Sequence, residues 1–222
     1  DFIITGPTNG ARGYARGLEL GFQTRLDKLP GLLAGLGLQA NYTYVDSKMH
    51  RYDAVPSTFC SAGAGASNLN LFANGCDTDG RSFGDTPLPN LSRNTFNLAL
   101  LYDQGGFSAR VAYSWRQRYL YGVALNSDNT GPNQQNGLDT NPASATYQQG
   151  VLPIGLPLWA ESYGQLDAGL QYKVSDHLTF SLQGTNLTDA LYKQLMQQHV
   201  GMMNHNYFTS GRRYSVALQY SY

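Results

Sequence analysis

The hydrophobic positions of this chain recur with a period of two over most of its length. In residues 17–26, Leu18 and Leu20 share one side, whereas Glu19 and Gln23 share the other. This alternation is typical of a β-strand with one apolar and one polar face, and no segment sustains the 3.6-residue period of an amphipathic helix. The alternating segments are residues 17–26, 36–44, 94–102, 107–116, 165–174, 178–183 and 213–222. The pattern therefore predicts an all-β protein of about seven strands.

The connections between these segments differ greatly in length. Short turns are predicted at residues 27–35, 103–106 and 175–177, and longer loops at about 46–91, 117–162 and 187–206. Compact soluble domains rarely contain loops beyond about 15 residues without structure of their own. Outer-membrane barrels combine short periplasmic turns with long extracellular loops. The spacing therefore favours an antiparallel transmembrane β-barrel segment over a soluble sandwich.

Aromatic residues gather near the ends of the predicted strands, as in the two interfacial girdles of a membrane barrel. One group lies on the side of the long loops: Tyr42, Tyr44, Tyr113, Trp115, Trp159 and Tyr163. The other lies on the side of the short turns: Tyr102, Phe107, Tyr172, Tyr220 and Tyr222. The apolar residues between them are expected to face lipid. The opposite, lumen-facing side is expected to carry Glu19, Arg110, Arg116, Asp167 and Lys173.

The composition agrees with a β-barrel in a membrane and excludes one class of binding partner. Only 14% of the 222 residues are charged, and 15 basic residues balance 15 acidic ones, which excludes a basic nucleic-acid binder. Tyrosine, whose ring suits a membrane interface, occurs 16 times. No run approaches the roughly 20 apolar residues of a transmembrane helix. No signal peptide opens the chain at Asp1, so we expect a mature form or a fragment.

The strand count and the last residues point to part of a larger barrel. Bacterial single-chain barrels have an even number of strands, and unpaired edges are costly in lipid. The alternating end at Leu218, Tyr220 and Tyr222 is similar to the C-terminal signal that the barrel-assembly machinery recognises. We therefore expect residues 1–222 to form the C-terminal portion of the barrel.

Several motifs resemble those of TonB-dependent receptors. They are Gly-Leu-Glu-Leu-Gly-Phe at residues 17–22, the turn and strand at 29–44, Asn-Leu-Thr-Asp-Ala-Leu-Tyr at 186–192, and Gly-Arg-Arg-Tyr at 211–214. The resemblance implies a barrel of about 22 strands in the Gram-negative outer membrane, filled by a plug. It also implies energy-coupled uptake of a scarce substrate through TonB, which binds a TonB box. Neither plug nor TonB box is present in these residues, and no enzymatic activity is implied.

The two cysteines, Cys60 and Cys76, fall in one predicted extracellular loop, 16 positions apart. In an oxidising compartment a disulfide is expected, with two free thiols as the alternative. Closing a loop of this length stabilises the ordered state by roughly 3 kcal/mol in the chain-entropy model.

Two weak groups of metal ligands occur in the loops. Asp77, Asp79 and Asp85 resemble part of a calcium loop, but the full spacing and the terminal Glu are absent, so a solvated turn is the alternative. His199 and His205, with two nearby methionines, offer ligands for copper or haem iron, but match no closed site. Ordinary loop residues are therefore the favoured interpretation, and no cofactor is predicted. No spacing typical of a hydrolase, metalloenzyme or redox centre occurs.

The substrate is suggested only by loop composition. Candidate residues of a substrate vestibule are Tyr119, Tyr121, Asn126 and Trp159. Amide groups bond sugar hydroxyls and aromatic faces stack on pyranose rings, so an oligosaccharide is the first hypothesis. A ferric siderophore, or haem, is the second hypothesis, and a passive porin is the third.

Overall fold

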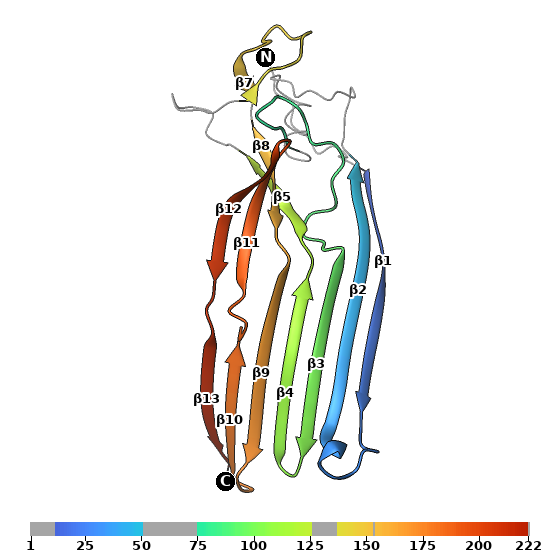
Figure 1. Ribbon diagram of the computed structural model, residues 1–222, viewed down its shortest axis with the longest axis vertical. Coiled ribbons are helices and arrows are strands. Elements are labelled where there is room, and N and C mark those ends of the chain that lie inside the picture. Colours follow the sequence, from blue (N-terminus) through green and yellow to red (C-terminus); the bar gives the residue numbers. More distant parts are fainter. Residues whose placement is uncertain (1–11, 51–74, 126–136, 153, 222) are drawn as a thin grey trace, which may run out of the picture.

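A computed structural model describes residues 12–50, 75–125, 137–152 and 154–221. Seven antiparallel strands form one sheet, called here the main sheet, in the order β1-β2-β3-β4-β9-β10-β13 (Figure 1). They are β1 (Arg12–Arg25), β2 (Leu36–His50), β3 (Asn94–Gln104), β4 (Phe107–Arg116), β9 (Tyr163–Lys173), β10 (Leu178–Thr185) and β13 (Arg213–Tyr220). Each of the seven predicted segments forms one of these strands, so the all-β prediction is confirmed.

A four-stranded sheet, called here the small sheet, lies at one end of the main sheet, which we call the loop end (Figure 1). Its order is β12-β11-β8-β5, and a separate pair joins β6 to β7. The bounds are β5 (Tyr119–Leu125), β6 (Gly137–Leu138), β7 (Gly150–Leu152), β8 (Gly155–Ala160), β11 (Leu191–Gln198) and β12 (Gly201–Thr209). A short 3₁₀ helix, η1 (Gly31–Gly35), precedes β2. No helix in the described ranges is long and apolar enough to cross a membrane.

The small sheet corrects the predicted loops at residues 117–162 and 187–206, which contain paired strands. These strands lack a clean two-residue period. In β8 most residues are buried, on both faces of the strand, and Pro157 has no backbone N–H to donate to a neighbouring strand. In β11 the register shifts between Gln194 and Leu195. A strand buried on both faces, or broken by a bulge, shows no alternation.

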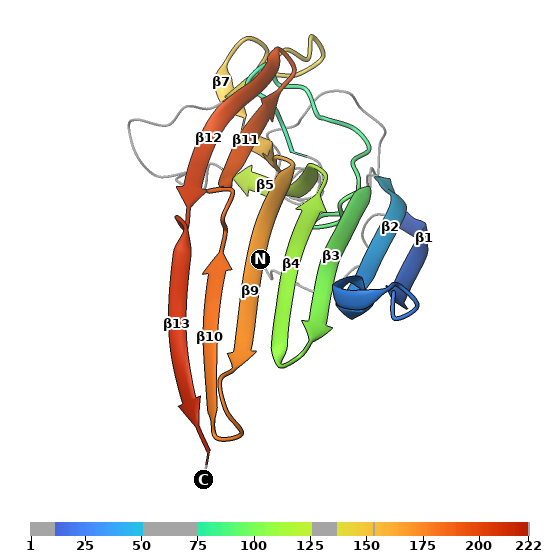
Figure 2. The same cartoon turned by 60° about the horizontal axis from the view of Figure 1, so that its bottom comes forward.

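The two faces of the main sheet differ in chemistry. One side encloses a hollow of about 670 Å³, lined by the polar positions of the alternation, among them Gln23, Arg110, Asp167 and Gln183. The apolar positions form the opposite face, where side chains are exposed, such as Leu98 at 46%. Figure 2 shows that the sheet curves from β13 to β1. An exposed apolar face of this extent marks an interaction surface, and in a barrel that surface meets lipid.

Asn186, in the turn between β10 and β11, connects the small sheet to the main sheet through hydrogen bonds. This residue is 1% exposed and has a φ of 55°. Its side-chain oxygen accepts from the Ala190 N–H at 2.8 Å. Its side-chain amide donates to Ser210 Oγ and to the Gly211 carbonyl, both at 3.2 Å. The backbone N–H donates to Asp167 Oδ1 at 2.8 Å. The first residue of the 186–192 motif therefore fixes where the β11–β12 hairpin leaves the main sheet.

We expect Asn186→Ala to lower the free energy of unfolding by about 2–4 kcal/mol, because the three hydrogen bonds of its buried side chain are lost, each worth about 1 kcal/mol. Denaturant unfolding of the purified, folded protein measures this. Asn206→Ala is the matched control, since Asn206 is exposed on β12, and it should change stability by less than about 0.5 kcal/mol. Equal effects of the two substitutions would contradict the connecting role of Asn186.

We expect Leu98→Arg to destabilise the protein in lipid by about 2–4 kcal/mol, because it places a charge on the lipid face near mid-strand. Asn97→Arg is the control at the same depth, on the polar face of β3, and should cost less than about 0.5 kcal/mol. Unfolding in vesicles measures both. If the chain tolerated the two arginines equally, the assignment of faces would be wrong.

Candidate functional site

Residues 75–86 form a tight turn that is bonded to the small sheet. The N–H of Cys76 donates to the Gly155 carbonyl at 2.7 Å, and the N–H of Gly155 donates back at 2.9 Å. Gly75 has a φ of 82°, and a Cβ there would overlap the Gly155 carbonyl oxygen. The N–H of Asp77 then donates to the Arg81 carbonyl at 2.9 Å. These bonds hold Asp77 against the start of β8.

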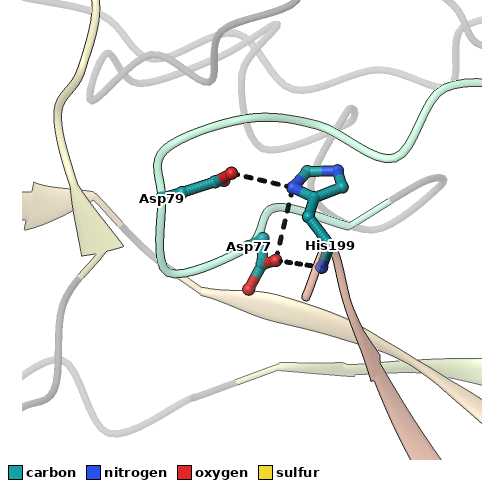
Figure 3. Close-up of side chains that lie close together, drawn as sticks. All are labelled: Asp77, Asp79 and His199. Atoms are coloured by element: carbon teal, nitrogen blue, oxygen red, sulfur yellow. Dashed lines mark hydrogen bonds and ion pairs between the residues drawn. The ribbon is translucent and has the colours of Figure 1, made fainter. Parts of the chain in front are cut away.

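Three predicted ligand residues meet at this turn: Asp77, Asp79 and His199 (Figure 3). His199 Nδ1 lies 3.3 Å from Asp77 Oδ2 and 3.0 Å from Asp79 Oδ2. The backbone N–H of His199 also donates to Asp77 Oδ2, at 2.6 Å. The Asp77 side chain is 3% exposed, whereas those of Asp79 and His199 are 41% and 35% exposed. The turn and the β11–β12 hairpin are thus joined through one imidazole ring, 120 positions from Asp79.

Backbone amides orient both carboxylates. Asp77 Oδ1 accepts from the N–H of Thr78 at 2.6 Å, and Asp79 Oδ1 accepts from the N–H of Arg81 at 3.0 Å. Each carboxylate therefore keeps its second oxygen, Oδ2, directed at His199. On the other side, Phe83 stacks on the His199 ring with centroids 4.6 Å apart. Packing and hydrogen bonds together fix the positions of the three ligand atoms.

The segment that contains β6 and β7 supports the same turn. Thr140 Oγ1 donates to the backbone carbonyl of Asp79 at 2.7 Å. The neighbouring Asp139 is 1% exposed, and Thr146 Oγ1 donates to its carboxylate at 2.6 Å. Hydrogen bonds from Ser144 and Thr146 lower the pKa of Asp139 below its usual range. This carboxylate also accepts from the Asn141 N–H at 3.0 Å, so its bonds order the chain on both sides of Thr140.

The other two predicted metal ligands lie apart from this group. Asp85 forms an ion pair with Lys48, with Oδ2 and Nζ 2.9 Å apart. His205 lies on β12 and is exposed. Among the described residues, the group of ligand atoms within 4.8 Å of one another comprises Asp77, Asp79 and His199.

Tyr119, a predicted vestibule residue, is packed rather than open. It is 7% exposed. The Arg116 guanidinium carbon lies 3.7 Å from the centre of its ring, and its hydroxyl lies 3.2 Å from that of Tyr192. Burial, and then the Tyr192 hydrogen bond, raise the pKa of Tyr119 to about 12. Its position suits a structural role at the start of the small sheet.

Trp159 and Tyr121 are accessible. The partly exposed Trp159 donates from its indole N–H to Gln197 Oε1 at 2.7 Å, and the Arg118 guanidinium carbon lies 5.6 Å from its ring centre. Tyr121 is 49% exposed, at a register shift where β5 pairs with β8. Asn126 lies outside the described residues. Trp159 on β8 therefore has an amide from β11 and the guanidinium of Arg118, just before β5, beside its indole, and β5 carries an exposed phenol at Tyr121.

Three of the predicted lumen residues share the polar face of the main sheet. Arg110 and Asp167 line the hollow. Gln23 on β1 also lines the hollow, and Glu19, four positions earlier on the same strand, lies on the same face. Asp167 Oδ1 accepts from Gln165 Nε2 at 2.8 Å, as well as from the backbone near the loop end.

The other two predicted lumen residues lie at the ends of the main sheet. At the loop end, Arg116 donates to Ser92 Oγ at 3.0 Å and to the Asn90 carbonyl at 3.1 Å. At the turn end, Lys173 Nζ pairs with Asp176 at 2.9 Å. Both side chains therefore hold connections at the ends of the sheet. By the alternation they share the face of Ser114 and Gln171, which line the hollow, so their lumen-facing role stays a prediction.

The predicted assembly signal and disulfide are described only in part. Leu218 and Tyr220 are 70% and 66% exposed on β13, while Tyr222 lies outside the described residues. Cys76 is buried at 1% exposure. Its predicted partner, Cys60, also lies outside the described residues, so the bridge stays a prediction.

Sequence reasoning missed two features of the loop end. It assigned Asp77 and Asp79 to one metal hypothesis and His199 to another, and it gave no role to Phe83. No short-range signal links these residues. It also missed the bond from Trp159 to Gln197, which follows from the register of β8 and β11 only once both strands are recognised.

A curved antiparallel sheet with an apolar outer face, a polar hollow and long structured connections at one end defines the wall of an outer-membrane β-barrel. Residues 1–187 match the family model described as TonB dependent receptor-like, beta-barrel, and the chain therefore belongs to the TonB-dependent receptor family. This family places the chain in the Gram-negative outer membrane and implies interaction with TonB. Its members are transporters, not enzymes. No curated protein and no solved structure shows a significant match.

Proposed function

We propose that this chain forms part of a receptor that takes up an oligosaccharide, with energy delivered through TonB. The observation that carries the proposal is the accessible aromatic group on the small sheet. The partly exposed Trp159 donates from its indole N–H to Gln197, and Tyr121 is exposed on β5, the strand that pairs with β8. Aromatic faces stack on sugar rings, and amide and guanidinium groups bond their hydroxyls. A rigid indole costs little entropy on binding.

We propose further that residues 1–222 are the C-terminal portion of a barrel of about 22 strands, completed by strands, a plug and a TonB box from other parts of the receptor. The open edges of the main sheet support this proposal. Among the described strands, β1 pairs only with β2, and β13 only with β10. Unpaired backbone groups on those edges would each cost several kcal/mol in the bilayer, so further strands must cover them. Leu218 and Tyr220 would then belong to the segment that the assembly machinery recognises.

Titration calorimetry of the purified receptor with an oligosaccharide series and with ferric chelates, including haem, tests the substrate. We expect oligosaccharide binding, and an affinity about 10-fold weaker in Trp159→Ala because the stacking surface is lost. Trp115→Ala is the matched control, because Trp115 lies on β4 in the main sheet, and its affinity should be unchanged.

Uptake by cells with and without TonB separates coupled transport from passive diffusion. Uptake that persists without TonB would identify a porin-like route. Binding of ferric chelates alone would replace the oligosaccharide proposal with the siderophore one.

We also propose a Cys60–Cys76 disulfide within the extracellular loop. The burial of Cys76 beside β8 supports a fixed position for its sulfur. A thiol titration under denaturing, non-reducing conditions should detect no free thiol in the chain, and two after reduction. Two thiols before reduction would reject the bridge.

A further inference from the structure

We propose that Asp77, Asp79 and His199 form a binding site for a divalent transition-metal ion of the zinc class, which joins the 75–86 turn to the β11–β12 hairpin. The site comprises side chains from two connections that are far apart in the sequence. It is independent of which substrate the receptor carries.

The spacing of the ligand atoms fits such an ion. Zinc binds imidazole nitrogen and carboxylate oxygen at about 2.0–2.1 Å with tetrahedral geometry, which places neighbouring ligand atoms about 3.3–3.4 Å apart. His199 Nδ1 lies 3.3 Å from Asp77 Oδ2 and 3.0 Å from Asp79 Oδ2. All three ligand atoms lie within 4.8 Å of one another. Small side-chain adjustments are sufficient to surround an ion.

Charge also favours a cation at this point. Two carboxylates converge on one imidazole nitrogen, and the Asp77 side chain is 3% exposed. This carboxylate accepts hydrogen bonds from Thr78 and from the His199 backbone N–H, and a cation beside Oδ2 would further offset the cost of burying its charge. A divalent ion neutralises both carboxylates while the imidazole remains neutral and coordinates through Nδ1. The set of two oxygens and one nitrogen suits zinc-class ions, whereas calcium takes six to eight oxygens.

The surroundings hold the ligands in the manner of a metal site. The bonds from the Thr78 and Arg81 amides orient Oδ1 of each carboxylate. Oδ2 of Asp79 then faces the imidazole, and Oδ2 of Asp77, which accepts one bond from the His199 backbone N–H, keeps a second lone pair for the ion. Phe83 fixes the plane of the imidazole. Such supporting contacts usually orient metal ligands and tune their affinity. The exposures of Asp79 and His199, 41% and 35%, give the ion access and leave room for water as a fourth ligand.

Metal binding would have a mechanical consequence at the loop end. The turn is bonded to β8 through Cys76, and the hairpin pairs with β8 through β11. An ion bound by both the turn and the hairpin tip would therefore link the turn, β8 and the hairpin in a closed ring of contacts. Trp159 lies on β8, within that ring. The site therefore stabilises this arrangement by mass action, by an amount that rises with the logarithm of the free metal concentration above the dissociation constant.

The test uses the complete receptor, folded in detergent and stripped with a chelator, with Zn²⁺ as the probe. Calorimetry should show one more zinc equivalent in the wild type than in His199→Gln or Asp79→Asn, or at least about 10-fold weaker binding in those variants. His205→Gln is the matched control, an exposed histidine on the same hairpin, and should bind as the wild type does. Heat-modifiable migration on gels verifies that each variant is folded.

Cobalt provides a second measurement that does not depend on the variants. Co²⁺ bound to the wild type should give the intense visible absorption of tetrahedral coordination, and Zn²⁺ should displace it. Equal zinc binding by the wild type and His199→Gln would overturn the proposal. So would the absence of zinc binding by the wild type at concentrations up to about 100 µM, which corresponds to a weak dissociation constant. So would a loss of binding in His205→Gln equal to that in His199→Gln.

Discussion

Backbone hydrogen bonding inside the bilayer is the constraint on which the rest of this structure depends. Lipid offers no partner to an N–H or C=O group, so strands that cross it must pair without interruption. The main sheet meets this requirement: none of its described ladders contains a register shift, and β1 pairs with β2 from Arg12 to Arg25. Register shifts occur instead in the small sheet and in the β6–β7 pair. Register shifts between paired strands are thus confined, among the described residues, to the loop end.

The same division explains where the buried core lies. Side chains of the main sheet face either lipid or the hollow, and few of them are buried. The loop end has a small core of its own, which includes Leu120 and Ala160 at 0% exposure and Leu195 at 9%. Outside the bilayer, backbone groups that strands leave unpaired can bond to water. Bulges, a proline and buried carboxylates are therefore tolerated there. Asp77 and His199 meet because the 75–86 turn and the β11–β12 hairpin are both bonded to β8.

The main sheet could be predicted from the sequence because its two faces meet different surroundings, lipid on one side and water on the other, and this imposes the alternation of apolar and polar residues. The strand predicted at residues 107–116 has the same bounds as β4. The sequence was insufficient to predict β8 and β11. The residues of β8 face protein on both sides, and those of β11 change face at the register shift between Gln194 and Leu195. The meeting of Asp79 with His199 depends on pairing across 120 positions. No local pattern contains that information, although each residue type was recognised as a ligand.

Whether β3 crosses a bilayer with one face toward lipid is tested most directly by spin labels placed singly at residues 95–101 of the receptor in vesicles. Accessibility to dissolved oxygen should peak at Phe96, Leu98 and Leu100, which alternate with the polar side. Accessibility to a water-soluble nickel chelate should be lowest at those same positions. A profile without this two-residue period, or one with its phase reversed, would contradict the assignment of this sheet as a membrane wall.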